Sequence, residues 1–309
     1  MKSFVFLAAM FSVLLAVIVF MSFIFYNQYL AEKVVLAPVV NDGGADEPIL
    51  YSPEDILFYD NIRFLNLLVS YSIDGGCDET RYDDAKTAFK ILGDNTVLDF
   101  YEKPEGEILV LCSDKEKELP DEHFVIGEGG PNAILNTGKY AVILNGTVYL
   151  YRESECDEPV VAMHEILHVI GFNHSQDENS IMYKVSNCKQ EIDNTIIEKI
   201  KELYEDPVLP DMIFKNINAT KKGVYIDLSA EVVNEGLAKS DNVFIKIYSE
   251  DKEIKSYNLG GFESGTGKVI NVDNLRIPYL SQNIILIIDP DNKIEEINKT
   301  NNKIELKIE

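Results

Sequence analysis

The residues best suited to chemistry lie in one stretch, residues 160–183, which reads VVAMHEILHVIGFNHSQDENSIMY. It contains His164, His168 and His174, three of the four histidines in the chain. His164 and His168 are four residues apart in an apolar, helix-forming run, so their side chains project from one helix face, one turn apart. Gly171 suits the left-handed conformation that ends a helix and redirects the chain, which brings His174 round to face the other two.

Three neutral imidazoles aimed at one point form the ligand set of a catalytic zinc ion, because they leave a fourth coordination position open. Glu165 follows the first histidine and is placed to act as general base toward a zinc-activated water. The alternative for any single histidine is a buried core residue, and short HExxH matches also occur by chance. The complete HExxHxxGxxH pattern, with one other histidine in the whole chain, favours one catalytic zinc ion.

The N-terminal residues indicate the compartment. Residues 4–26 carry no charge and are mostly Phe, Val, Leu, Ile, Ala and Met. A helix of this length spans a hydrocarbon core of about 30 Å. A cleaved signal peptide is the alternative, but its apolar region is usually shorter, about 7–15 residues. Because Lys2 favours a cytoplasmic start, we expect residues 1–26 to be a single-pass transmembrane signal anchor in the cell membrane, with the N-terminus inside and the remaining chain extracellular.

The cysteines agree with an exported protein, and the charge limits its possible partners. The formal net charge of -24 argues against a nucleic-acid or anionic-membrane partner. Four cysteines without close metal-ligand spacing predict two disulfides. We favour Cys77–Cys112 and Cys156–Cys188 among the possible pairings, the second because it would bracket the histidine segment. A cysteine thiolate that occupies the zinc as a latency device is the alternative.

Hydrophobic patterning divides the rest of the chain into a linker and two domains. Residues 27–50, with Pro, a Gly-Gly pair and acidic side chains, are expected to be a linker. Residues 51–206 alternate strand-like and amphipathic helical runs, which is typical of an α+β domain. Within it, YAVILN and TVYLYR are expected to form a hairpin around Gly146. Residues 207–309 contain short alternating runs between Asn-, Gly- and Asp-rich turns, which predict an all-β immunoglobulin-like sandwich.

The HEILHVIGFNHS motif followed by SIMY resembles the matrixin branch of the metzincin zinc endopeptidases, over roughly residues 60–205. The resemblance implies a mixed sheet with an active-site helix and a C-terminal helix. It implies that the three histidines bind the metal, that Glu165 is the catalytic acid/base, and that Met182 supports the metal site from a Met-turn. It also implies that an extended substrate pairs with a rim strand. The rim residues we expect are Gly127, Glu128 and Gly129.

The tail resembles a second family. PDMIFKNI, EVVNEGLAKSDN and IIDPDNKIEEINKTNN are similar to segments of the CARDB-type modules of prokaryotic surface proteins, which are immunoglobulin-like sandwiches. The resemblance implies a possible cell-surface ligand for residues 207–309, with a plain spacer as the alternative. Calcium is a possible second cofactor, but the acidic loops are too unspecific to place it.

These features together predict a membrane-anchored, extracellular zinc metalloendopeptidase that acts on protein or peptide substrates. One alternative is a cell-surface adhesion or binding protein whose metal domain is catalytically silent. The intact Glu165 argues against it, because a degenerate protease often loses its base or a ligand. Another alternative, a structural zinc protein, requires a fourth protein ligand, and none is evident.

Overall fold

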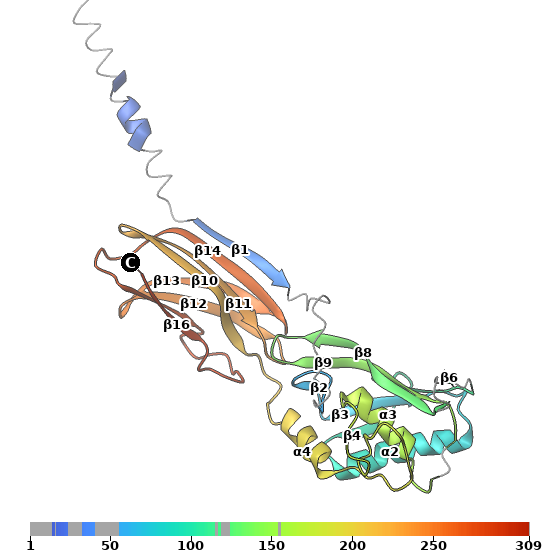
Figure 1. Ribbon diagram of the computed structural model, residues 1–309. Helices are drawn as coiled ribbons and strands as arrows, with labels where there is room; N and C mark the ends of the chain where they lie inside the picture. The colour runs from blue at the N-terminus through green and yellow to red at the C-terminus, as the bar shows by residue number, and fades with distance from the viewer. Residues whose placement is uncertain are drawn as a thin grey trace, which may run out of the picture.

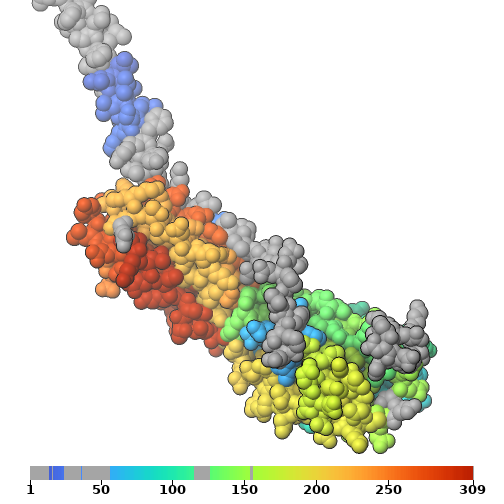
Figure 2. All heavy atoms as spheres, viewed as in Figure 1, coloured from blue at the N-terminus to red at the C-terminus, as the bar shows by residue number. Residues whose placement is uncertain are grey.

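The computed structural model describes residues 14–15, 17–23, 33–40, 56–114, 117–118, 124–153 and 156–308. Beyond the N-terminal helical residues, these form two lobes joined end to end, a mixed α/β lobe and a β-sandwich (Figure 1). The space-filling view shows the same elongated arrangement, with the sandwich between the N-terminal helical residues and the α/β lobe (Figure 2). Each lobe has its own hydrophobic core.

The α/β lobe is built on one sheet with the strand order β2-β9-β5-β3-β4, and β8 pairs with the remaining edge of β9. The strands are β2 (Ile62–Phe64), β3 (Leu68–Ile73), β4 (Asp99–Glu102), β5 (Ile108–Cys112), β8 (Gly127–Asn136) and β9 (Ala141–Leu150). A separate short pair is formed by β6 (Lys117–Glu118) and β7 (Phe124–Val125). Within the main sheet the pairings are parallel except that of β8 with β9. The strand β8 is therefore an antiparallel edge strand, as expected for the rim segment.

Three helices complete this lobe, namely α2 (Glu79–Asn95), α3 (Val160–Ile170) and α4 (Asn194–Leu203). Helix α2 begins at Asp78, whose side chain accepts the backbone N–H of Arg81 and so caps the helix. Helix α3 is buried over its whole length, which explains its nearly continuous apolar sequence. Helix α4 begins at Asp193, which caps it in the same way, and packs one apolar face on the core.

The prediction of a hairpin around Gly146 is wrong. Strand β9 runs without a turn through this residue, which pairs with Ile108 on one side and Pro131 on the other. A Cβ atom at Gly146 would lie 2.4 Å from Cγ1 of Val169 on α3. The glycine therefore allows the helix to approach the sheet, a role that a strand glycine can have instead of forming a turn.

The second lobe is a sandwich of two antiparallel four-stranded sheets, with orders β1-β14-β11-β10 and β13-β12-β15-β16. The first sheet contains β1 (Lys33–Val40), β10 (Met212–Lys222), β11 (Tyr225–Asn234) and β14 (Thr266–Arg276). The second contains β12 (Ser240–Ser249), β13 (Lys252–Phe262), β15 (Asn283–Ile288) and β16 (Lys303–Lys307). Alternate residues of these strands point inward and form the core of the sandwich. The predicted all-β sandwich is confirmed.

Strand β1 corrects the expectation that residues 27–50 are only a linker. It pairs antiparallel with β14 from Lys33 opposite Asp273 to Val40 opposite Thr266. Because β1 is an edge strand, Pro38 is tolerated in it. The chain therefore contributes a strand to the sandwich before it enters the α/β lobe, and returns to the sandwich after α4 (Figure 1).

The predicted anchor lies mostly outside the described residues. Residues 14–15 and 17–23 are helical, with exposed apolar side chains. Among the described residues, no helix is long and apolar enough to cross a membrane.

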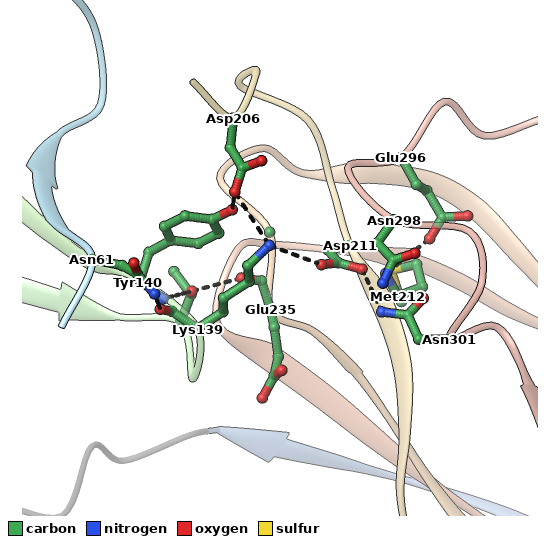
Figure 3. Close-up of polar contacts among 12 residues, drawn as sticks. Asn61, Lys139, Tyr140, Asp206, Asp211, Met212, Glu235, Glu296, Asn298 and Asn301 are labelled. Carbon is green, nitrogen blue, oxygen red and sulfur yellow. Dashed lines mark hydrogen bonds and ion pairs between the residues drawn. The ribbon is translucent and has the colours of Figure 1, made fainter. Parts of the chain in front are cut away.

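The two lobes meet through a polar junction drawn in Figure 3. Lys139, which precedes β9, points between Asp206 and Asp211 of the connecting segment, with Nζ at 3.3 Å and 3.8 Å from their carboxylate oxygens. The hydroxyl of Tyr140 donates a hydrogen bond to Asp206. On the sandwich side, the side-chain amide of Asn301 donates to the Asp211 carboxylate over 2.9 Å.

A small apolar cluster lies beside these contacts. Its buried members are Tyr140, which directly precedes β9, Val142 of β9, and Leu237 of the sandwich. Burial and the hydrogen bond to Asp206 raise the pKa of Tyr140 to about 12, so that its hydroxyl stays protonated at neutral pH. Apolar packing and paired charges therefore hold the lobes together at one place.

Candidate metal centre

The metal centre begins with two histidines one turn apart on the buried helix α3. The Nδ1 atom of His164 lies 2.7 Å from the carbonyl oxygen of Ile181, and Nδ1 of His168 lies 2.8 Å from that of Phe172. Because a carbonyl oxygen only accepts hydrogen bonds, each Nδ1 carries the proton. The Nε2 atom of each neutral ring is then left with a free lone pair, as a metal ligand requires.

The third histidine is brought to the same place by the turn after α3. Gly171 has φ 112° and its N–H bonds back to the carbonyls of Leu167 and His168. A side chain at this backbone conformation would be strained, so glycine ends the helix here. The chain after Gly171 is held by the segment that precedes β2, since Asn173 donates its N–H to the carbonyl of Ile56. His174 follows and is exposed.

The geometry of the three rings fits a zinc ion. One ring-nitrogen ligand atom from each of His164, His168 and His174 lies within 4.8 Å of the others. The Nε2 atoms of His168 and His174 are 3.2 Å apart. Two nitrogens bound to one tetrahedral zinc at about 2.0–2.1 Å would be about 3.3 Å apart. Among the described residues, this is the one group of three or more side chains that could hold a metal ion. A calcium site is not shown.

The electrostatics also suit a metal ligand set. Burial, with a smaller contribution from the neighbouring histidine rings, lowers the pKa of His164 to about 4 and that of His168 to about 3. Burial and the positive charge of Lys184 lower the pKa of His174 as well. The rings of His164 and His168 therefore stay neutral well below pH 6.5, and protons compete only weakly with a cation for their lone pairs.

Glu165 lies next to His164, with only 6% of its surface exposed. Burial first, and the nearby carboxylate of Glu128 second, raise its pKa to about 8. Its side chain lies against the rim strand, because a Cβ at Gly127 would be 2.8 Å from Oε1 of Glu165. A buried carboxyl group whose pKa is near neutrality is suited to accept and return a proton.

Gly127, Glu128 and Gly129 lie beside this helix, on the first part of β8. Gly129 packs on the backbone of Glu165, where an added Cβ would be 2.1 Å from the carbonyl oxygen. Glu128 accepts a hydrogen bond of 2.8 Å from the hydroxyl of Tyr151. Burial and this hydrogen bond raise the pKa of Tyr151 to about 12. Tyr151 did not emerge from the sequence, since nothing in the strand-like run TVYLYR distinguishes it from a surface tyrosine.

Met182 is buried within the main core and forms part of a turn that returns to the histidines. Its carbonyl accepts the N–H of Ser175 over 2.7 Å, and its neighbour Ile181 supplies the carbonyl that holds His164. The hydroxyl of Ser180 bonds to Asp193 at the start of α4. The turn that contains Met182 therefore orients one histidine through its backbone.

Both disulfides have the pairing that we favoured. Cys77 is joined to Cys112, and Cys156 to Cys188, with Cα atoms 5.0 Å and 5.2 Å apart. The described cysteines include none that is free, so the alternative of a thiolate on the metal is not supported. The second disulfide joins the chain before α3 to the chain after the Met-turn, and so brackets the histidine segment.

A buried helix that carries two of the histidines packs against the antiparallel edge strand β8, in a domain that is joined to a β-sandwich. Comparison with known families identifies both parts of the chain. Residues 69–205 match the family model for matrixin, and residues 209–306 match the model for CARDB. The chain thus contains a matrixin domain followed by a CARDB domain. No curated protein matches the chain.

Several solved structures are similar to parts of the chain. The CARDB domain of the PF1109 protein from Pyrococcus furiosus, in complex with di-metal ions, is 17% identical and covers 33% of this chain and 90% of that chain, with a TM-score of 0.27. Myroilysin is 10% identical and covers 50% and 89%, with a TM-score of 0.29. High choriolytic enzyme 1, a hatching enzyme zinc-protease from the medaka fish Oryzias latipes, is 14% identical and covers 35% and 44%, with a TM-score of 0.23.

The domain assignment rests on the two family models, because the structural likenesses are low in identity and TM-score. The matrixin family implies zinc, and the three histidines meet the requirements of a zinc site. These findings support a zinc metalloprotease.

Proposed function

We propose that the chain is a zinc-dependent metalloendopeptidase that hydrolyses peptide bonds in extracellular proteins or peptides. The observation that carries the proposal is the constellation of His164, His168 and His174 with Glu165 beside them. Two of the rings are buried and held in one tautomer, and the third is exposed. A catalytic zinc site needs such a set, with three neutral nitrogen ligands and a side that a substrate can reach.

The chemistry would be divided between the metal and the chain. Zinc, when bound by the three histidines, supplies the Lewis acidity that activates water and polarises a carbonyl group. The carboxylate of Glu165 would take the proton from the attacking water and deliver it to the leaving amine nitrogen. Met182 would support the site by holding the turn that carries Ile181 against His164.

The substrate would bind along the rim strand. Strand β8 has one edge paired with β9, and an extended peptide could add to its other edge through backbone hydrogen bonds. Gly127, Glu128 and Gly129 lie beside Glu165 on this strand. A peptide bond held along this part of β8 would lie close to the proposed base.

The location is also part of the proposal. The uncharged apolar residues 4–26 would anchor the chain in the cell membrane, with the N-terminus inside. Two disulfides in the matrixin domain agree with an oxidising compartment outside the cytoplasm. The CARDB domain would lie on the same side and could bind a surface ligand or act as a spacer.

Metal dependence tests the proposal. The full-length chain in detergent should cleave an unfolded protein, lose this activity on treatment with a chelator, and regain it with one equivalent of zinc. His174→Ala should lose both zinc and activity. His123→Ala, which changes the one histidine outside the motif, is the matched control and should keep both. Full cleavage by the chelated protein would exclude zinc catalysis.

A further inference from the structure

The end of the sandwich farthest from the matrixin domain displays two large apolar side chains. Tyr279 and Leu280 are 73% and 84% exposed, more than any other large hydrophobic residue among those described. They are the central residues of the turn between β14 and β15, which is closed by a 3.1 Å hydrogen bond from the N–H of Ser281 to the carbonyl of Pro278. Such positions usually hold Gly, Asn, Asp or Ser, so this pair requires an explanation.

This turn is held in place by its neighbours. Ser281 is buried, and its hydroxyl bonds to that of Ser249 at the end of β12. Its carbonyl accepts a 2.8 Å hydrogen bond from Nζ of Lys221 on β10. The carboxylate of Glu250 accepts the N–H of Gln282 over 3.2 Å. The two apolar side chains are therefore presented on a turn that is tied to two other strands.

The chain enters the sandwich from the proposed anchor at this same end. Strand β1 begins at Lys33, opposite Asp273, and β14 ends shortly afterwards at Arg276, just before the turn. In Figure 1, the N-terminal helical residues and the start of β1 lie at this end of the sandwich. Residues 27–32 separate the apolar stretch from β1. A fully extended chain spans about 3.3–3.6 Å per residue, so six residues hold this end within about 20 Å of the membrane surface.

The charges at this end differ from those of the whole chain. The formal net charge of the protein is -24. At this end of the sandwich, however, five strands begin or end with a basic residue, and the other three with an uncharged one. The basic residues are Lys33, Lys222, Lys252, Arg276 and Lys307. Acidic residues lie at this end too, since Glu250 and Asp251 form the β12–β13 turn and Lys222 is paired with Asp227 over 2.6 Å. The two signs are therefore mixed here, and strong repulsion from lipid phosphates is avoided.

We propose that this end of the CARDB domain rests on the membrane, with Tyr279 and Leu280 inserted among the lipid headgroups. The proposal rests on the proposed anchor, which supplies the high local concentration that such a small apolar surface needs. Tyrosine is favoured at the membrane interface, and lysine and arginine can extend toward phosphates around it. Since β10 and β14 contain 11 residues each, the sandwich holds the matrixin domain about 35 Å from the bilayer.

The absence of tryptophan from the chain allows a direct test. Leu280→Trp places a single tryptophan in the turn of the full-length protein, which is reconstituted into phosphatidylcholine vesicles with brominated acyl chains. The fluorescence should shift to shorter wavelength and lose about half of its intensity by bromine quenching, as expected for an interfacial aromatic residue. Leu144→Trp, at a side chain of the matrixin domain that is 51% exposed, is the control and should show neither change.

Flotation of the same vesicles separates this proposal from that of the anchor. If the protein floats with the vesicles but the fluorescence of Leu280→Trp behaves like that of Leu144→Trp, the anchor is supported and the docking of the turn is overturned. A chain that does not float with them overturns the anchor and the docking together.

Discussion

Gly127 of β8 and Glu165 of α3 lie so close together that a Cβ atom on the glycine would be 2.7 Å from Cγ of the glutamate. Two residues along the strand, Gly129 lies even closer to the backbone of Glu165, where an added Cβ would be 2.1 Å from the carbonyl oxygen. Because alternate residues of a strand face the same side, these two glycines both face α3. The rim strand therefore determines where the proposed catalytic carboxylate lies.

Gly127→Ala should displace the Glu165 carboxylate without touching the histidines. We expect kcat to fall on the order of 100-fold, as for other small displacements of a catalytic group, while zinc content stays unchanged. Steady-state kinetics and metal analysis measure the two effects. Gly130→Ala is the matched control, since a Cβ there meets nothing within 4 Å, and should retain activity. Normal kcat for Gly127→Ala would show that the contact does not position the base.

Part of the metal site could be predicted from the sequence, and part of it could not. The histidine spacing and Gly171 follow local rules of helix geometry and helix termination, so the ligand set could be predicted from the residues alone. The carbonyl of Ile181 that holds His164, and the contact of Tyr151 with Glu128, could not. These contacts join separate segments of the chain, whose proximity in space the local sequence pattern does not show.

The fold was predictable to a similar extent. Periodicity indicated α2 and most strands of both domains, because each buries one regular face. It could not show that KVVLAPVV forms β1, since its partner β14 lies more than 200 residues later in the chain. It also assigned Gly146 to a turn, because the sequence does not show that Val169 packs against that position.

The two disulfides should differ in their effect on the metal site. They close loops of similar size, with sequence separations of 35 and 32, so removal of either should lower the free energy of unfolding by about 3–4 kcal/mol. Only Cys156–Cys188 brackets the histidines. We expect the double alanine variant at Cys156 and Cys188 to bind zinc more weakly, and that at Cys77 and Cys112 to bind it normally. Competition with a zinc indicator measures this, and equal affinities in the two variants would contradict it.

The raised pKa of Glu165 predicts a pH-dependent stability of the metal-free protein. The folded state keeps a proton on this carboxyl up to about pH 8, whereas the unfolded chain releases it near pH 4.5. The contribution of Glu165 to stability therefore falls as the pH rises from 4.5 to 8. Glu165→Gln does not titrate, so it should be more stable than the wild type at pH 8, and its advantage should vanish near pH 4.

Urea unfolding of both proteins at the two pH values measures this difference. One pKa unit corresponds to about 1.4 kcal/mol, so the gain at pH 8 is at most a few kcal/mol. The lowered pKa values of His164 and His168 destabilise the folded protein as the pH falls below 6.5, but they do so in both proteins and cancel. Equal stability at pH 8 would mean that the carboxyl is not buried as described.

The junction between the domains should depend on Tyr140. Tyr140→Phe removes the hydrogen bond to Asp206, and we expect a loss of about 1 kcal/mol. The two domains should then unfold in more clearly separated thermal transitions, measured by calorimetry. Tyr82→Phe removes an exposed hydrogen bond to Glu102 within the matrixin domain and is the control. An unchanged transition in Tyr140→Phe would show that the junction does not couple the domains.

The central claim is that Glu165 acts with a zinc ion held by His164, His168 and His174. Its most direct test compares the wild type with Glu165→Gln, each carrying one equivalent of zinc as measured by metal analysis, in the cleavage of an unfolded protein. The account predicts equal zinc content and a loss of cleavage rate on the order of 100-fold to 10,000-fold in the variant. Equal rates in the two zinc-loaded proteins would contradict it.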